Sequence, residues 1–402
     1  MYYFIDEFLN FNRFTFGIFI DKIMLKKQKE GYFMETTTFF ALDIGNKQTK
    51  LKSSKKKYVI PSSLVDQEDV MSIFSLDRKD NRIRDTFSAN LNGDTKKYYL
   101  GQGIFNYSQD KIQDSIGYSG RYDQEIYSLL NEFALGILGK DFNSDELSSV
   151  CVAVGVPTGD YVDQKNNIIS KIKSIFLNRQ KDGTFSPKKH LISIDGKEMV
   201  IRVVEVLVFP QTMGAFYDEV LNDNLTLKDN NLLEERVGIV DLGGGTALFD
   251  QVIRNNLDPN ARIQLQTGAT VLYDSIANSI QQQLGVNPDI HKIEKMIKET
   301  LQRKNGVTEF IYKQSVNNIF DVTDLVLNKI HKYTITTANK VFSTFKSLDE
   351  IDVILVTGGT ANIIDHDLFA RVFRNKTKVK FVEDSEFANV NGFYKFTRFS
   401  VE

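Results

Sequence analysis

Two short stretches decide the fold: Asp43-Ile44-Gly45-Asn46-Lys47-Gln48-Thr49-Lys50 and Asp241-Leu242-Gly243-Gly244-Gly245-Thr246. Each lies between two apolar, β-rich runs, so each predicts a tight turn between two strands. Glycine lets main-chain amides in such a turn approach a phosphate closely. One Asp-x-Gly turn is typical of an ordinary hairpin. Two copies about half the chain apart indicate a duplicated architecture with a phosphate-binding turn in each half.

Both turns begin with an aspartate at the end of a strand that we expect to be buried, Asp43 in one and Asp241 in the other. An unpaired buried carboxylate is costly. A hydrated Mg²⁺ explains both carboxylates, because this ion takes oxygen ligands and usually keeps several waters. Thr49, Lys50 and Thr246 can add donors to phosphate oxygens.

Two further segments fit a nucleotide site. Thr357-Gly358-Gly359-Thr360 follows a predicted strand and precedes a short helix, so its small residues permit a base and ribose to lie against the backbone; alone, it equally fits an ordinary strand–helix turn. Gln211 follows Phe209-Pro210 at the start of a predicted helix. Its side chain can orient a water for in-line attack on a γ-phosphate, or it can simply cap that helix.

Strands alternate with helices along the rest of the chain, which indicates an α/β fold. Residues 62–96 are polar and irregular in pattern and predict a surface insertion. Strands are predicted over 37–43, 48–53, 58–60, 149–156, 190–194, 198–208, 237–241, 246–253, 351–356 and 379–382. Helices are predicted over 121–138, 159–176, 211–221, 268–284, 321–346 and from about 385 onward.

Composition excludes several classes of protein. The 402 residues include 50 Lys and Arg against 52 Asp and Glu, a net charge of −2, which excludes a globally basic nucleic-acid binder and a highly charged disordered chain. The single cysteine, Cys151, excludes an internal disulfide framework and fits a reducing, cytoplasmic location. One Cys and four His argue against a protein-built zinc site. No apolar run is long enough to span a membrane.

The first 36 residues leave three interpretations open. They are rich in aromatic residues and are followed by lysines, a pattern that fits a helix lying in a membrane interface through residues 1–33. They also fit a contact with a partner or polymer. Alternatively Met34 is the true start, and residues 34–45 lead directly into the first strand.

The order of these segments resembles that of the actin superfamily, whose two halves each contain an RNase H-like fold. The chain is most similar to bacterial ParM-type (StbA-like) actins of plasmid segregation, on the segments ALDIGNKQTKLK, VAVGVPTGDY, VFPQTMGAFYD, IVDLGGGT and VEDSEFANVNGFYKF. The resemblance implies an actin-like ATPase fold with two RNase H-like domains flanking a nucleotide cleft. Domain I would span 37–209 and domain II 210–402, with the C-terminal helix returning to domain I.

The resemblance also implies a role for each motif residue. Asp43 and Asp241 would hold Mg²⁺ through water, and Gln211 would orient the attacking water, where some relatives have Glu. The nucleoside would contact Gly358, Gly359 and Thr360. The phosphates would be bound by Gly45, Asn46, Lys47, Thr49, Lys50, Gly243, Gly244, Gly245 and Thr246.

The implied function is polymerisation with ATP or GTP and Mg²⁺, followed by disassembly after hydrolysis. The partners would be further copies of the chain in a helical filament and a DNA-binding adaptor of ParR type, without direct contact to nucleic acid. The near-neutral charge fits such indirect attachment. Alternatives are an MreB-like membrane-associated actin, and a non-polymerising ATPase such as a sugar or acetate kinase or a chaperone-type protein.

Overall fold

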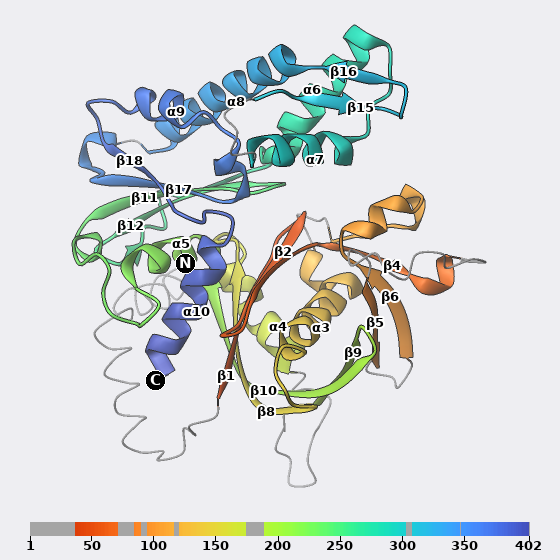
Figure 1. Ribbon diagram of the computed structural model, residues 1–402. Coiled ribbons are helices and arrows are strands. Elements are labelled where there is room, and N and C mark those ends of the chain that lie inside the picture. The colour runs from red at the N-terminus through yellow and green to blue at the C-terminus, as the bar shows by residue number, and fades with distance from the viewer. Residues whose placement is uncertain are drawn as a thin grey trace. The chain divides into compact units, whose positions relative to one another are not determined.

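The computed structural model describes residues 37–70, 84–89, 95–115, 120–173, 189–302, 308–345 and 347–401 (Figure 1). The predicted N-terminal extension, residues 1–36, lies outside the described residues. The described chain divides into two compact units. Unit 1 holds the described residues up to Lys228 together with those from Asn389 onward, and unit 2 holds Asp229–Ala388. The boundary between the units in the chain therefore follows Lys228, whereas the sequence patterns predict a boundary at 209/210.

Unit 1 is built on a ten-stranded mixed sheet in the order β3-β2-β1-β8-β10-β9-β5-β6-β4-β7. Strands β1, β8 and β10 are parallel to one another, and β2 runs antiparallel to β1. The strands are β1 (Thr38–Ile44), β2 (Gln48–Lys52), β3 (Lys57–Pro61), β4 (Ser63–Asp66), β5 (Arg84–Ala89), β6 (Thr95–Leu100), β7 (Gln113–Asp114), β8 (Glu146–Val156), β9 (Lys189–Ile194) and β10 (Lys197–Pro210). The helices are α3 (Glu125–Gly139), α4 (Tyr161–Lys173), α5 (Gln211–Val220) and α10 (Ala388–Val401).

The core of unit 1 forms where α3 packs on this sheet, which curls around the helix in Figure 1. The sequence of α3 is apolar almost all round, so nearly the whole helix after its first turn is buried. Gly136 allows the close approach, because a Cβ atom there would lie 2.6 Å from the Ile192 side chain of β9. Strands β1 and β8 supply the facing apolar surface, as their uninterrupted hydrophobic runs predict.

The predicted surface insertion over residues 62–96 is wrong for the residues that the structure describes. Strands β4, β5 and the start of β6 fall in this range and belong to the main sheet. Leu64 and Val65 have no exposed surface. The strands are short and carry charged residues beside the apolar ones, so the range lacks the long hydrophobic runs by which strands are recognised.

Unit 2 contains a six-stranded sheet in the order β13-β12-β11-β17-β18, with β14 also paired to β12. Its strands are β11 (Arg236–Leu242), β12 (Ala247–Ile253), β13 (Asn256–Leu257), β14 (Ile263–Leu265), β17 (Val353–Thr357) and β18 (Lys378–Phe381). A separate hairpin consists of β15 (Ile311–Lys313) and β16 (Ile319–Asp321). The helices are α6 (Ala269–Leu284), α7 (Ile290–Leu301), α8 (Thr323–Thr344) and α9 (His366–Val372).

The two units repeat one arrangement. In unit 1, β1 pairs antiparallel with β2 and parallel with β8; in unit 2, β11 pairs antiparallel with β12 and parallel with β17. Asp43 lies opposite Lys50 in the first hairpin, and Asp241 lies opposite Leu248 in the second. The duplicated strand–turn–strand pattern predicted from the sequence is therefore present, and the α/β class is confirmed.

Helix α10 packs against α5 through glycines on both helices. A Cβ atom at Gly392 of α10 would lie 1.8 Å from the carbonyl oxygen of Gly214 in α5, so the two backbones are in direct contact. The buried Lys395 ammonium lies 2.6 Å from Asp218 Oδ1 and donates to the Leu221 carbonyl at 3.0 Å, at the C-terminal end of α5. These contacts fix the position of α5 in unit 1.

Within the described residues, no helix has both the length and the apolar character needed to cross a lipid bilayer.

Replacing Gly392 with alanine will destabilise the protein, although Gly→Ala inside a helix ordinarily stabilises by up to about 1 kcal/mol. The added methyl group must separate two backbones, and overpacking of this kind costs about 1–3 kcal/mol. Thermal unfolding measures the change. The control is Asn166→Ala on the exposed side of α4, which should shift stability by no more than about 0.5 kcal/mol. An unchanged melting temperature for Gly392→Ala would contradict the helix contact.

Candidate functional site

The first glycine turn joins β1 to β2 in unit 1. The Gly45 N–H donates to the Gln48 carbonyl at 3.0 Å, which closes the turn. A Cβ atom at Gly45 would lie 2.7 Å from that same oxygen, so only glycine fits without a shift of the backbone. The turn therefore brings the backbone of residues 45–48 into a compact loop at the end of a buried strand.

Asp43 lies at the base of this turn and is 1% exposed. Its Oδ2 atom is buried and accepts no hydrogen bond from the described residues. The Lys50 ammonium lies 3.5 Å from that oxygen, and Lys50 is itself buried. An oxygen that is both buried and short of a hydrogen bond is costly, so this carboxylate is suited to accept from a ligand or its waters.

The Thr49 side chain makes its hydrogen bond within the protein. Its hydroxyl is completely buried and shares a hydrogen bond of 2.9 Å with the Ser62 hydroxyl. The Ser62 N–H donates to the Lys47 carbonyl at 3.0 Å. Thr49 therefore helps to hold the turn in place, and its donation to a phosphate stays a prediction, as do the roles of Asn46 and Lys47.

Arg121 was not predicted as a site residue, and its side chain contacts the first glycine turn. Its Nη2 atom donates to the carbonyls of Ile44 at 2.7 Å and Gly45 at 2.8 Å. The guanidinium lies over the Tyr127 ring, 5.6 Å from its centroid. Burial raises the pKa of Tyr127 to about 12, so the ring stays an uncharged phenol beside this cation. An arginine just before a helix has no distinguishing pattern, so sequence reasoning had no signal for it.

Gln211 lies at the same edge of the unit 1 sheet as Asp43. The register pairs Leu42 of β1 with Val154 of β8, and Val154 with Val208 of β10, so the three parallel strands end together. Ligands of open α/β sheets bind at this carboxyl edge. Gln211 is the first residue of α5, and Pro210 occupies the cap position. The structure thus brings Asp43, Gly45 and Gln211 to one edge, with β8 between their strands.

The second glycine turn, in unit 2, has the same geometry as the first. The Gly243 N–H donates to the Thr246 carbonyl at 2.9 Å, and a Cβ atom at Gly243 would lie 2.9 Å from that oxygen. Asp241 at its base is 2% exposed. The Gly244 carbonyl accepts from both the N–H and the hydroxyl of Thr270, each at 2.9 Å. The first turn of α6 therefore holds this loop through hydrogen bonds to the Gly244 carbonyl.

The third loop lies directly against the second. Gly358 has a φ of 90°, and a Cβ atom there would lie 2.4 Å from the Leu242 carbonyl oxygen and 2.5 Å from Asp241 Oδ1. The Thr360 hydroxyl donates to the Gly243 carbonyl at 2.8 Å. Thr360 thus ties the two loops together, and its contact with a nucleoside, like that of Gly359, stays a prediction.

The donor set fits Mg²⁺ better than a metal held wholly by protein. Among the described residues, no group of three or more His, Cys, Asp or Glu side chains gathers closely enough to hold a metal ion. Mg²⁺ is bound through one or two carboxylates, substrate phosphates and waters. The buried Asp43 oxygen without a hydrogen bond matches that requirement, and so does the buried carboxylate of Asp241.

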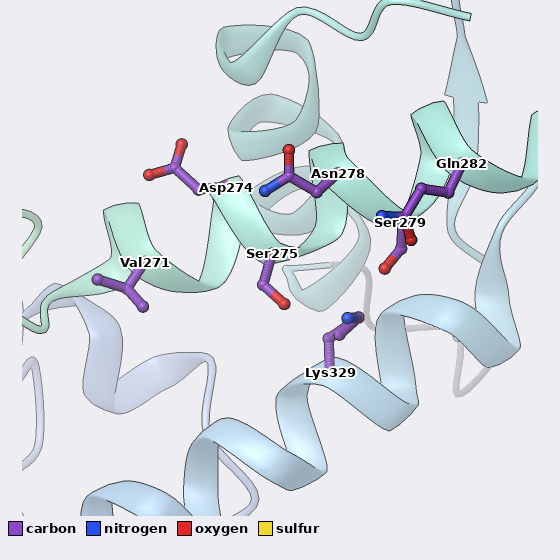
Figure 2. Close-up of a pocket in the computed structure, with 7 residues that line it drawn as sticks. All are labelled: Val271, Asp274, Ser275, Asn278, Ser279, Gln282 and Lys329. Carbon is purple, nitrogen blue, oxygen red and sulfur yellow. The ribbon is translucent and has the colours of Figure 1, made fainter. Parts of the chain in front are cut away.

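An open groove of about 440 Å³ lies between α6 and α8 in unit 2. Figure 2 shows Lys329 of α8 facing the side of α6 that carries Ser275 and Ser279. The remaining lining residues, Val271, Asp274, Asn278 and Gln282, also belong to α6. This groove is the partly exposed polar side of a helix and offers no turn of main-chain amides, so the glycine loops are the stronger candidate site.

Two family models match the chain. The first, described as the N-terminal domain of actin like proteins, matches residues 41–214, and the second, the Alp7A C-terminal domain, matches residues 236–388. No curated protein matches the chain by sequence.

Solved structures share the fold at low sequence identity. The apo pSK41 ParM protein is 20% identical with a TM-score of 0.66, and the match covers 90% of this chain and 98% of that one. ParM from a 15-stranded filament of Clostridium botulinum is 17% identical with a TM-score of 0.66, covering 90% and 99%. Bacillus thuringiensis ParM with ATP is 14% identical with a TM-score of 0.65, covering 90% and 98%.

These likenesses confirm the actin-like fold that the motif order predicts. The matched domains follow one another in the expected order, and each contains one of the two Asp-x-Gly turns. The chain is therefore an actin-like protein, with an N-terminal domain of the actin like proteins followed by an Alp7A C-terminal domain.

Proposed function

We propose that the chain binds ATP or GTP with Mg²⁺ through its three glycine loops, hydrolyses it, and assembles into filaments while the triphosphate is bound. The observation that carries the proposal is the duplicated turn. In both units a glycine N–H closes a four-residue turn, and a buried aspartate lies two residues before that glycine. Such turns present main-chain amides to an anion.

The phosphates are bound by main-chain amides and by lysine charge. Gly45 and Gly243 permit the close backbone approach, and the half-buried Lys47 adds a positive charge at the first turn. Lys50 faces Asp43 across the hairpin and is placed to donate to a phosphate oxygen that approaches this carboxylate.

Asp43 and Asp241 are the residues that would hold hydrated Mg²⁺. When bound, the ion neutralises charge that develops on the phosphates. Gln211 orients the attacking water from the N-terminus of α5, because its amide can both donate and accept. It does not take a proton from that water, since an amide has no suitable pKa.

Filament formation follows from the type of contact that actin-like chains make. A head-to-tail contact that does not close into a ring produces an open helix of copies. Loss of the γ-phosphate removes contacts that order the loops, so the assembled state weakens after hydrolysis. The C. botulinum relative is described as a filament, and the B. thuringiensis relative was solved with ATP, which supports both parts of the proposal.

We assign the filament to plasmid segregation through a DNA-binding adaptor of ParR type. The near-neutral chain, with a net charge of −2, favours attachment through an adaptor over direct binding to DNA. The structural relatives named ParM, one of them described as a filament, support the filament in this assignment.

Addition of ATP or GTP with Mg²⁺ should raise the right-angle light scattering of the purified protein, and electron microscopy of the same sample should show filaments. The signal should fall as nucleotide is consumed, and EDTA should prevent the rise. Hydrolysis with flat scattering would contradict polymerisation and would favour a kinase-type or chaperone-type ATPase.

Gln211→Ala should slow hydrolysis about 10²-fold while nucleotide affinity stays near that of the wild type, because misplacement of a reacting water costs rate rather than binding. Filaments of this variant should persist longer in the scattering assay. Single-turnover hydrolysis and a fluorescent-nucleotide titration measure the two quantities. Asp163→Ala, on the exposed side of α4, is the control. Unchanged turnover in Gln211→Ala would remove this residue from the mechanism.

Gly358→Ala should abolish nucleotide binding, because the new methyl group collides with Asp241 Oδ1 and the Leu242 carbonyl. The matched control is Gly196→Ala. Gly196 also has a positive φ, 78°, but nothing lies within 4 Å of an added Cβ atom. Both variants carry the backbone strain of alanine at positive φ, and only Gly358→Ala changes the site. Equal affinity in the two variants would contradict a role for the third loop.

A further inference from the structure

The carbonyl of the first glycine is held differently in the two turns. In unit 2, the Gly243 carbonyl accepts from the Ala269 N–H at 3.1 Å and from the Thr360 hydroxyl at 2.8 Å, so the N-terminus of α6 and the third loop secure it. In unit 1, the equivalent Gly45 carbonyl accepts from Arg121 at 2.8 Å. One arginine side chain therefore does in unit 1 what a helix start and a threonine do in unit 2.

Arg121 reaches the turn because it precedes the helix. It begins a short 3₁₀ turn, Arg121–Asp123, and α3 begins only at Glu125. Its guanidinium holds two consecutive carbonyls, those of Ile44 and Gly45, with one nitrogen. The guanidinium binds both carbonyls and lies over the Tyr127 ring at the same time.

The direction of these carbonyls sets the direction of the amides. In a trans peptide the N–H points opposite to the C=O of the same unit. Holding the Gly45 carbonyl toward Arg121 therefore turns the Asn46 N–H to the side of the loop opposite Arg121. That is the side on which a phosphate must bind if the turn is to present its amides.

A hydrogen-bond network completes the support. Arg121 Nε donates to the Ser115 hydroxyl at 3.3 Å, the Ser115 N–H donates to the Ser62 carbonyl at 2.9 Å, and the Ser62 N–H donates to the Lys47 carbonyl at 3.0 Å. The network thus connects two points of the turn, the Gly45 carbonyl and the Lys47 carbonyl. Arg121 is only 6% exposed; the groups that it contacts directly are neutral, and the buried Asp43 carboxylate acts on the same Tyr127 ring. A buried cation of this kind favours an anion nearby.

We propose that Arg121 is a positioning residue for nucleotide binding: it orients the Asn46 amide of the first glycine turn toward the phosphates and supplies buried positive charge behind it. The inference rests on the proposed nucleotide-binding function. It assigns the residue no contact with the nucleotide: the Nε and Nη2 atoms bind Ser115 and the backbone of the turn.

The test compares Arg121→Met and Arg121→Lys with the wild type, using fluorescent analogues of ADP and GDP for affinity and steady-state hydrolysis for kcat and KM. Arg121→Met should weaken nucleotide binding about 10- to 100-fold, the range for loss of hydrogen bonds to a charged group. Arg121→Lys should restore part of the affinity, because it keeps the charge but loses the Nε donor to Ser115 and the planar group over the Tyr127 ring. KM should rise in both variants while kcat changes much less, since Gln211 and both aspartates are intact.

Lys197→Met is the matched control. Its ammonium also binds two main-chain carbonyls in unit 1, those of Lys140 at 3.2 Å and Phe142 at 2.9 Å, but beyond the C-terminal end of α3. Thermal unfolding should show that both methionine variants lose stability, whereas only Arg121→Met loses nucleotide affinity.

Four outcomes would overturn the inference. Wild-type affinity in Arg121→Met, or an equal loss in Arg121→Met and Lys197→Met, removes the specific role of Arg121 while nucleotide binding by the wild type stands. A wild-type protein that binds neither nucleotide overturns the proposed function itself and this inference with it. If Arg121→Met does not fold, Arg121→Lys decides: reduced affinity at a normal melting temperature supports the role, and full affinity refutes it.

Discussion

The structure depends on one backbone constraint, which occurs once in each unit. A strand ends in a buried aspartate, and the next glycine turns the chain so tightly that its own N–H bonds the carbonyl three residues on. No side chain fits at Gly45 or Gly243 without displacing that carbonyl. The constraint places a costly carboxylate and a set of main-chain amides at the same edge of each sheet. A parallel third strand and contacts from neighbouring side chains support that edge in each unit.

The two turns differ in sequence, and different hydrogen bonds hold them in place. The second turn has three consecutive glycines and lies against the first turn of α6, so helix amides and small residues secure it. The first turn has Asn46 and Lys47 in place of glycines and relies on buried side chains, among them Thr49 and Ser62. The first turn therefore offers lysine charge, whereas the second offers mainly main-chain amides.

Sequence reasoning succeeded where the physics is local. The glycine turns, the buried strands β1 and β11 and the long helices follow from hydrophobic period and from backbone requirements that only glycine meets. It failed where the determinants are distant in the chain. The strands of residues 62–96 are stabilised by neighbours that the pattern does not reveal, and Arg121 meets Gly45 only after folding. The hydrogen bonds of the Thr49 and Thr360 hydroxyls were also missed, because local sequence does not show whether a threonine binds the protein itself or a ligand.

The contact between Gly214 and Gly392 has a consequence for how the chain is made. Unit 2 is a continuous segment, Asp229–Ala388, and can close as soon as it leaves the ribosome. Unit 1 needs α10, whose glycine meets α5 only after all of unit 2 has been translated. Helix α5, which begins at Gln211, thus gains its contact with α10 only after unit 2 has been translated. A nascent chain therefore carries an unfinished first unit until the residues of α10 have been translated.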